Sequence, residues 1–188
     1  MLSPATNLRG IYIDPLLRMI REQNTKIKAL NLRNEDKLQG MVPNDPNQTL
    51  VLLMDFDSDP ERVWSQLLPH LEPLREAGFL TYFNGSAVVQ GPLTIVATGN
   101  GPFHRILERS TFRDVFYDAP LLQLLPLSDQ TPLESSNYGA QNSYYASADF
   151  RVAIGNVNSN GFSGKQLSDV RQQVQTAHRL GLKVRYWG

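Results

Sequence analysis

Apolar and polar positions fall in blocks that predict strands followed by helices. A continuous apolar run at residues 50–54 ends abruptly in acidic residues, which are Asp55, Asp57 and Asp59. A strand that is apolar on both faces is typical of a parallel sheet with cover on both sides. Ligands of parallel α/β folds bind at the carboxyl ends of the strands, so we expect any chemistry of this chain there.

Helices and further strands follow from the spacing of apolar residues. Apolar positions three and four apart predict three helices, over residues 14–24, 60–78 and 163–180. Short apolar runs predict three more strands, over residues 93–97, 114–117 and 182–187. Asn84-Gly85 is a preferred hairpin turn and predicts pairing of the residues on either side of it.

Three segments have no clear pattern. Residues 26–48 are polar with scattered leucines and predict a loop. Residues 121–142, which are rich in Pro, Ser, Gln and Asn, predict a long loop that contains a short helix. Residues 144–150 fit a strand or a short helix equally well.

The alternation of strands and helices predicts an α/β fold of parallel βαβ units with right-handed crossovers. A closed eight-stranded barrel typically needs about 250 residues. The chain has 188 residues, and about four core strands can be counted in it. We therefore expect one domain or part of a larger one, cut from a bigger architecture.

Composition narrows the function. Eighteen basic residues balance eighteen acidic ones, so no overall field draws the chain to nucleic acid or to an anionic membrane. No cysteine is present, which excludes disulfides, thiol nucleophiles and cysteine-ligated metal sites. No apolar run reaches the length of a membrane span, and the compartment is not determined.

The acidic residues after the first apolar run have two readings. Hard carboxylate oxygens at a strand end are suited to binding Mg²⁺. Alternatively, Asp55 and Asp59 cap the helix that begins near Pro60. The two roles are compatible, and the sequence does not decide between them.

Eight ordered segments resemble the altered inheritance of mitochondria protein 6 family, a fungal group among the phospholipase-C-like and glycerophosphodiester-phosphodiesterase-like barrels. They are residues 11–15, 48–55, 71–75, 78–81, 97–100, 116–120, 142–147 and 178–187. The resemblance implies one partial (β/α)8 TIM barrel of the PLC-like phosphodiesterase type over residues 1–188, without the first and the last strands.

The resemblance also implies a divalent cation, usually Mg²⁺, beside two catalytic histidines. The metal polarises a phosphodiester, and the histidines act as general acid and base. The family motifs that supply these groups are His-Asn-Asp-Tyr-like, Glu-Ala-Asp and Gly-His-Asp sequences, and none of the three occurs in this sequence. The family's downstream Asn-Val-Asp-Asp-Leu segment is also missing.

Asp55 matches the family's third carboxylate, and we expect it to be a metal ligand. The family often has lysine two residues later, where this chain has Asp57, and the reversed charge weakens phosphate binding. Asn100, Asp118 and Trp187 match family positions near strand ends, where they line a pocket or serve in capping and packing.

The three histidines match no catalytic position of the family, and we expect them to be structural or surface residues. They are His70, His104 and His178. This leaves no catalytic residue assigned in the chain.

The resemblance therefore implies a metal-dependent phosphoric diester hydrolase that acts, in its complete form, on lipid-like or glycerol phosphodiesters. The chain alone is expected to be inactive. An alternative is a non-catalytic binding or interaction module, formed as a homo-oligomer that covers open sheet edges. A third reading is an incomplete gene model.

Overall fold

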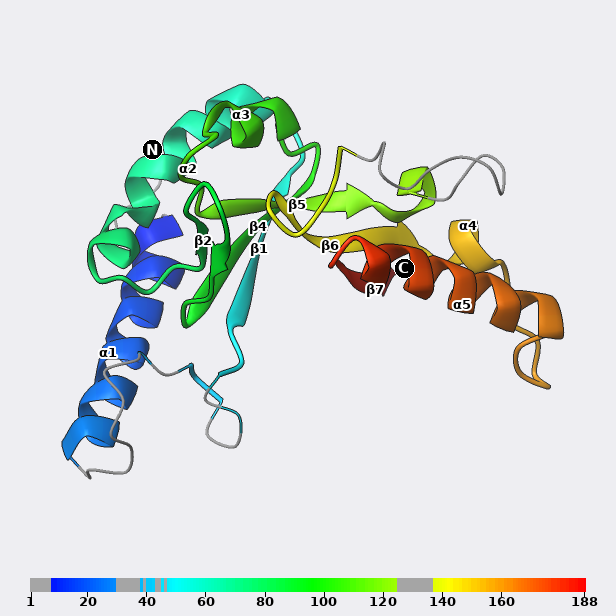
Figure 1. The fold of residues 1–188 in the computed structure, drawn as a ribbon, viewed down its shortest axis with the longest axis horizontal. Coiled ribbons are helices and arrows are strands. Elements are labelled where there is room, and N and C mark those ends of the chain that lie inside the picture. Colours follow the sequence, from blue (N-terminus) through cyan, green and yellow to red (C-terminus); the bar gives the residue numbers. More distant parts are fainter. Residues whose placement is uncertain (1–7, 30–37, 39, 43–44, 46, 125–136) are drawn as a thin grey trace. The chain divides into compact units, whose positions relative to one another are not determined.

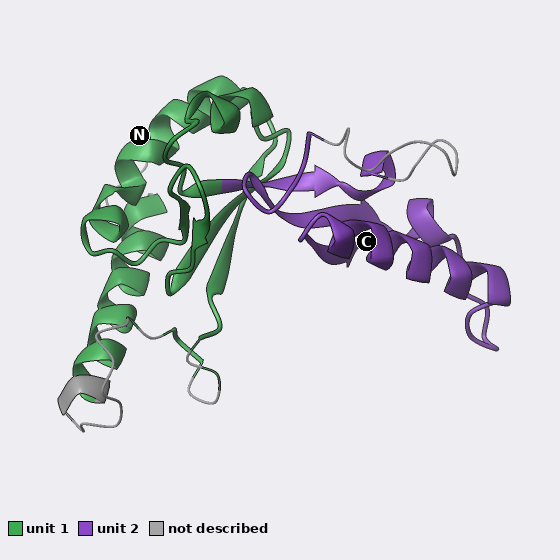
Figure 2. Cartoon of the chain, viewed as in Figure 1, with its two compact units in different colours: residues 1–115 green, residues 116–188 purple. Residues whose placement is uncertain are grey.

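A computed structural model describes residues 8–29, 38, 40–42, 45, 47–124 and 137–188. The chain divides into two compact units, residues 1–115 and residues 116–188 (Figure 2). The expectation of one domain over residues 1–188 stays a prediction.

Unit 1 contains a short antiparallel hairpin, two longer parallel strands and helices of very different lengths (Figure 1). Its elements are the π-helical turn η2 (Arg9–Ile13), α1 (Asp14–Ala29), β1 (Leu50–Phe56), α2 (Pro60–Glu76), β2 (Tyr82–Phe83), β3 (Val88–Val89), β4 (Leu93–Gly99) and α3 (Phe103–Glu108).

Unit 2 contains three strands and the helices that follow them, and β5 begins one residue before the division between the units. Its elements are β5 (Val115–Pro120), the 3-10 helix η3 (Leu121–Leu124), β6 (Ser143–Asp149), α4 (Phe150–Ile154), α5 (Gly164–Arg179) and β7 (Lys183–Trp187).

Parallel pairing confirms the α/β class. In unit 1, β1 pairs with β4 in parallel, and in unit 2 β6 pairs in parallel with both β5 and β7. Helices α2 and α5 connect strands in the order expected of βαβ units. The partial TIM barrel itself stays a prediction.

The expectation that residues 50–54 form a strand buried on both faces is wrong. Leu50 and Leu53 are 36% and 38% exposed, and along β1 only Phe56 is buried. The reason is position, because β4 is the one strand that pairs with β1 in the described part of the chain. The buried strand is instead β4, as its apolar run predicts, with every side chain from Leu93 to Ala97 buried.

Helix α2 confirms the most regular apolar pattern of the sequence. Asp59 is its N-cap and accepts a hydrogen bond from Arg62 N at 3.3 Å, and Pro60 follows in the first turn, where its fixed φ is favourable. Two prolines lie inside the helix without ending it. The buried side chains that hold it to the unit are Trp64, Leu67, Leu71 and Leu74.

The first helix begins at Asp14, where the sequence predicts it, but differs from its prediction in its cap and in its end. Asp14 before Pro15 predicts an N-cap, yet Asp14 is not a cap, because η2 leads directly into α1, and its carboxylate instead accepts from Arg9 Nε at 3.3 Å. The helix continues to Ala29, beyond the predicted end near residue 24. Asn24 is buried and donates its side-chain amide to the carbonyl of Ile20, so the polar residue is satisfied within the helix.

The remaining predictions for loops and short elements are resolved in part. The hairpin is confirmed, with Asn84 Oδ1 accepting the N–H groups of Ser86 and Ala87. The ambiguous residues 144–150 form strand β6 and the start of α4. The short helix predicted after residue 120 is η3, whereas residues 30–37 and 125–136 of the two predicted loops lie outside the described residues.

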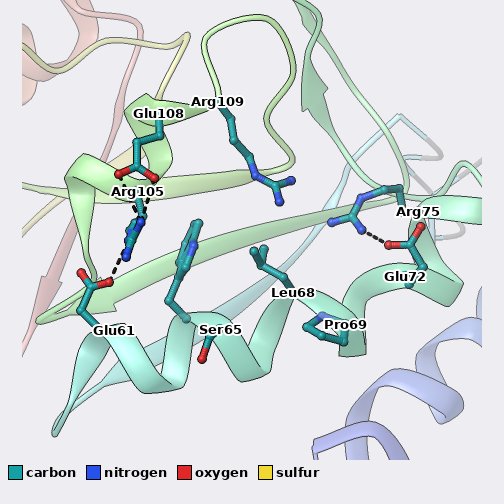
Figure 3. A pocket seen from close by; sticks show the side chains of 10 residues that line it. Glu61, Ser65, Leu68, Pro69, Glu72, Arg75, Arg105, Glu108 and Arg109 are labelled. Atoms are coloured by element: carbon teal, nitrogen blue, oxygen red, sulfur yellow. Dashed lines mark hydrogen bonds and ion pairs between the residues drawn. The ribbon is translucent and has the colours of Figure 1, made fainter.

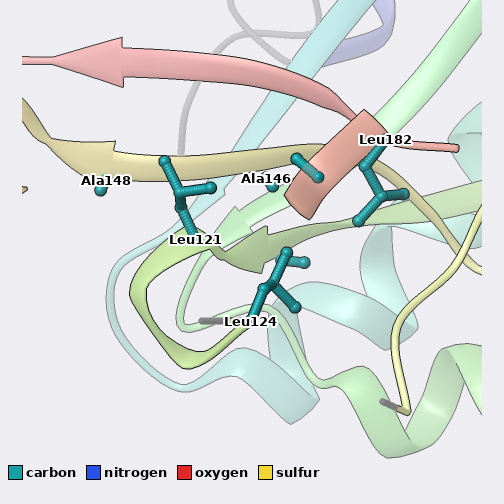
Figure 4. Close-up of a cluster of buried hydrophobic side chains, with 7 residues drawn as sticks. Leu121, Leu124, Ala146, Ala148 and Leu182 are labelled. Carbon is teal, nitrogen blue, oxygen red and sulfur yellow. The ribbon is translucent and has the colours of Figure 1, made fainter. Parts of the chain in front are cut away.

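The core of unit 2 lies between its strands and α5 (Figure 4). It combines leucines of η3 and of the turn before β7 with small alanines on β5, β6 and α5. Its buried members are Ala119, Leu121, Leu124, Ala146, Ala148, Ala177 and Leu182. Ser163 and Gln166 form a capping box that fixes the start of α5, as the predicted helix at residues 163–180 requires.

In the portion of the chain that is described, no helix has both the length and the apolar character needed to cross a membrane.

Candidate functional site

The carboxyl ends of β1 and β4 lie side by side, since Asp55 is in register with Thr98 and Phe56 with Gly99. The Asp55 carboxylate lies against Gly99, and a Cβ atom on residue 99 would come within 2.3 Å of Asp55 Oδ1. Gly99 also has a φ of +66°, a conformation that favours glycine. A residue without a side chain is therefore needed beside this carboxylate.

Asn100 ties the two strand ends together. Its backbone N–H donates to the carbonyl of Phe56 at 2.8 Å, and its side-chain amide donates to the carbonyl of Asp57 at 2.9 Å. Asp55, Asp57 and Asn100, which the sequence placed at strand ends, are thus brought to one edge of unit 1, and all three are exposed. Asn100 fixes the backbone on which Asp55 and Asp57 stand.

The two roles considered for the acidic residues, metal binding and helix capping, apply to different residues. Asp59 caps α2 from a left-handed backbone conformation, with φ 46°. Asp55 belongs to β1 and lies four residues before the cap. Capping therefore accounts for Asp59 and leaves Asp55 available for another role.

Asp55 suits part of a magnesium site rather than a whole one. Mg²⁺ is usually held through one or two carboxylates, together with water and phosphate oxygens. Asp55 supplies one such ligand from an exposed position. Among the residues that the structure describes, no three His, Cys, Asp or Glu side chains converge to hold a metal ion. These residues alone do not make a complete site.

In unit 2, the register of adjacent strands brings polar side chains of β5, β6 and β7 side by side on one face. Ser147 pairs with Arg185, and Arg185 reaches across β6 to β5. Its Nη2 donates to Asp118 Oδ2 at 2.7 Å and its Nε donates to Ser147 Oγ at 3.0 Å. The side chains of Asp118 and Arg185 are 3% and 27% exposed. Asp118 is thus the buried anchor of an ion pair that spans three strands.

Trp187, the last predicted pocket residue, lies at the end of β7 in register with Asp149 and is 51% exposed. Asp149 has a structural task, since its Oδ1 accepts from the N–H of Val152 at 3.0 Å and caps α4. Asp118 and Trp187 therefore lie in the same unit, two strands apart. Their predicted role in a pocket stays a prediction.

Several tyrosines of unit 2 titrate above their ordinary range. Burial raises the pKa of Tyr117, with the nearby Tyr138 and Asp118 adding to the effect. Burial also raises the pKa of Tyr145, Tyr138 and Tyr186. These four phenol groups therefore stay in the neutral form beyond the usual pH.

Each of the three histidines lies in a helix, and one of them contacts a carboxylate. His70 lies in α2 and His178 in the last turn of α5. His104, at the start of α3, lies 2.9 Å from Glu61, and Arg105 Nε donates to the same carboxylate at 2.7 Å. The hydrogen bond from Arg105 lowers the pKa of Glu61, and His104 adds to this.

Sequence reasoning missed Gly99, Ser147 and Arg185. The signal for the last two was available in the pattern, because β6 and β7 alternate polar with apolar side chains over the same rows. The role of Gly99 had no comparable signal, since a strand-to-helix turn accounts for a glycine there equally well.

Comparison with known proteins gives a family. The profile of the AIM6-like phosphodiesterase domain matches residues 1–118. No solved structure shows a significant match.

Curated relatives match the whole chain. The chain is 29% identical over 190 residues to an altered inheritance of mitochondria protein 6 homolog of Arthroderma benhamiae, covering 99% of this chain and 56% of the relative. It is 30% identical over 195 residues to altered inheritance of mitochondria protein 6 of Eremothecium gossypii, covering 100% and 48%. The chain thus spans about half the length of the curated relatives it matches.

Proposed function

Because this chain belongs to the AIM6-like phosphodiesterase domain family, we propose that it contributes part of a metal-dependent phosphodiesterase site, with Asp55 as one ligand of Mg²⁺. The observation that carries the proposal is the position of the Asp55 carboxylate against Gly99, at the carboxyl ends of two parallel strands. That is where parallel α/β folds bind their ligands. Bound Mg²⁺ would polarise a phosphodiester oxygen.

The residues around Asp55 have supporting roles in this proposal. Asn100 holds the end of β1 through its two hydrogen bonds to the carbonyls of Phe56 and Asp57, in the backbone that directly follows Asp55. Asp57 adds a second negative charge at the same edge. Since like charge disfavours a phosphodiester anion there, we expect this edge to bind a metal better than it binds a substrate alone.

The substrates proposed for the complete domain are lipid-like or glycerol phosphodiesters, by resemblance to the family. We propose that the 188-residue chain does not turn such substrates over by itself. The support is chemical, because the sequence contains none of the family's histidine or Glu-Ala-Asp motifs, and its described residues bring no three His, Cys, Asp or Glu side chains together to hold a metal ion. General acid and base catalysis needs a titratable group within hydrogen-bond reach of the reacting atoms.

The test is hydrolysis of bis(4-nitrophenyl) phosphate by the purified chain with Mg²⁺. We expect no release of 4-nitrophenolate above that of Mg²⁺ alone. Magnesium-dependent release that disappears in the Asp55→Ala variant would show that the chain carries a working site and would contradict the proposed inactivity. The Asp59→Ala variant, which changes a helix cap instead, is the matched control.

A second candidate function is a non-catalytic interaction module, with two copies of the chain paired along β1. The observation in its favour is the exposure of Leu50 and Leu53 on a strand with one neighbour in the described part of the chain. Such edges favour pairing with another strand, and a lysine on the edge opposes it.

Light scattering tests this candidate. A dimer that dissociates in the Leu53→Lys variant, and not in a Leu167→Lys variant changed on exposed α5, would support it. A monodisperse monomer would exclude it.

A further inference from the structure

Unit 1 has a groove of about 850 Å³ between α2 and α3 (Figure 3). The groove exists because α2 is much longer than α3. At about 1.5 Å per residue, the 17 residues of α2 extend much further than the 6 residues of α3. The short helix therefore leaves one side of α2 uncovered. Trp64, Leu68 and Pro69 of α2 form the apolar part of the lining.

The carboxylates that line this groove are already paired. Glu61 and Glu108 both accept from Arg105, and Glu72 accepts from Arg75. Arg75 is also held from the other side by Asp114, whose buried carboxylate accepts from its Nε. These pairs leave no lining glutamate without an arginine.

Arg109 is the exception among the lining arginines. It is exposed, and within the described parts of the chain its guanidinium forms no hydrogen bond or ion pair. Figure 3 shows this guanidinium directed into the groove toward Arg75, with Leu68 below. On the Arg75 side, Nη2 is buried and has no hydrogen-bond partner among the described residues. The lining arginines and glutamates balance in number, and among the described residues the Arg109 guanidinium is the lining cation that faces the groove without a carboxylate partner.

We propose that this groove binds a small monocarboxylate with an apolar body. One unpaired guanidinium matches one carboxylate, which it binds through two parallel hydrogen bonds. The apolar side chains of α2 match the body of the ligand, and the volume lies within the range of small-molecule sites. The inference goes beyond the proposed function and does not depend on it, since no residue of the groove is at the strand ends.

Titration with 4-phenylbutyrate tests the proposal, followed by the indole N–H signals of the chain's two tryptophans in ¹⁵N NMR spectra. Trp64 lines the groove and Trp187 belongs to the other unit, so the Trp187 signal serves as an internal control in the same spectrum. We expect the Trp64 signal to shift saturably with a Kd of about 1 mM. The Trp187 signal should not follow the same curve.

Two further probes separate charge from apolar contact. Acetate carries the charge alone, and 4-phenyl-1-butanol carries the apolar body alone, so both are expected to bind at least about tenfold more weakly than 4-phenylbutyrate. Equal binding of either probe would overturn the proposal, because the site would then recognise only one half of the ligand.

The matched variants are Arg109→Gln in the groove and Arg171→Gln at an exposed position of α5. Arg109→Gln is expected to weaken 4-phenylbutyrate binding about tenfold or more, Arg109→Lys to restore part of it, and Arg171→Gln to leave it unchanged. Undiminished binding by Arg109→Gln, or the absence of any saturable shift in the unmodified chain, would overturn the proposal.

Discussion

For single residues, the edge of unit 1 at the ends of β1 and β4 depends on a missing side chain at Gly99 as well as on the carboxylate of Asp55. Gly99 leaves the space that Asp55 Oδ1 occupies, and the family resemblance singled out Asp55 but gave no reason for the glycine beside it. A sequence identifies the residue type that carries chemistry. It does not report a contact between two strands that are more than forty residues apart along the chain.

The cap residue Asp59 was predictable, because its signal is local. Asp59, Pro60 and the apolar spacing that follows lie within a few residues of one another. The ion pair between Asp118 and Arg185 was not predictable, since it depends on the order and register of three strands. The local signal of the α2 cap was therefore read correctly, whereas the ion pair could be found only from the fold.

The Asp118–Arg185 pair gives the first prediction. Replacing Asp118 by Asn removes the buried partner of Arg185, and we expect a loss of about 2–3 kcal/mol of unfolding free energy, since the arginine is left without its counter-charge. Urea unfolding followed by circular dichroism measures it. Asp169→Asn, which breaks the exposed pair with Lys165, should cost less than about 1 kcal/mol. Equal losses in the two variants would contradict this role of Asp118.

Among the helices and strands, the sequence predicted every strand of the parallel sheet except β6, but not how each strand is covered. The apolar runs of β1 and β4 look alike, yet β4 is buried along five residues and β1 is not. The burial of a strand depends on the strands beside it, and the apolar pattern of one segment carries no information about those neighbours. Helix α2 was predicted well because its burial pattern repeats within the helix itself.

The strands of unit 2 give a pH prediction. Burial raises the pKa of Tyr117, Tyr138, Tyr145 and Tyr186 above the ordinary value near 10. At a pH between the tyrosine pKa of the unfolded state and that of the folded state, the folded state binds more protons than the unfolded state. The contribution of these tyrosines to the free energy of unfolding is therefore fully present below about pH 10. It is lost as the pH rises through the tyrosine pKa values of the folded state.

Urea unfolding from pH 8 to 12 checks this, with tyrosinate absorbance recorded in parallel. We expect stability to fall more steeply above about pH 10 in the unmodified chain than in Tyr186→Phe, because that variant removes one of the raised groups. Tyr12→Phe, which changes an exposed tyrosine of unit 1, is the control. Identical pH dependence in Tyr186→Phe and the unmodified chain would contradict the prediction.

At the scale of the whole molecule, the α/β class was predictable from alternation, and the resemblance to the family is confirmed by the match over residues 1–118. The division into two units was not predicted, because no composition shift or linker marks residue 115. The chain also spans about half the length of its relatives. The complete phosphodiesterase site therefore stays a proposal, in which Asp55 is one ligand of the metal.

Binding of a divalent cation by Asp55 can be measured by paramagnetic NMR with Mn²⁺ in place of Mg²⁺. Mn²⁺ prefers the same oxygen ligands and broadens the signals of nearby amides. We predict that low concentrations of Mn²⁺ broaden the amides of Gly99 and Asn100 first. The Asp55→Asn variant should lose this effect, while Asp59→Asn retains it. Broadening of these amides that persists in Asp55→Asn would contradict the account.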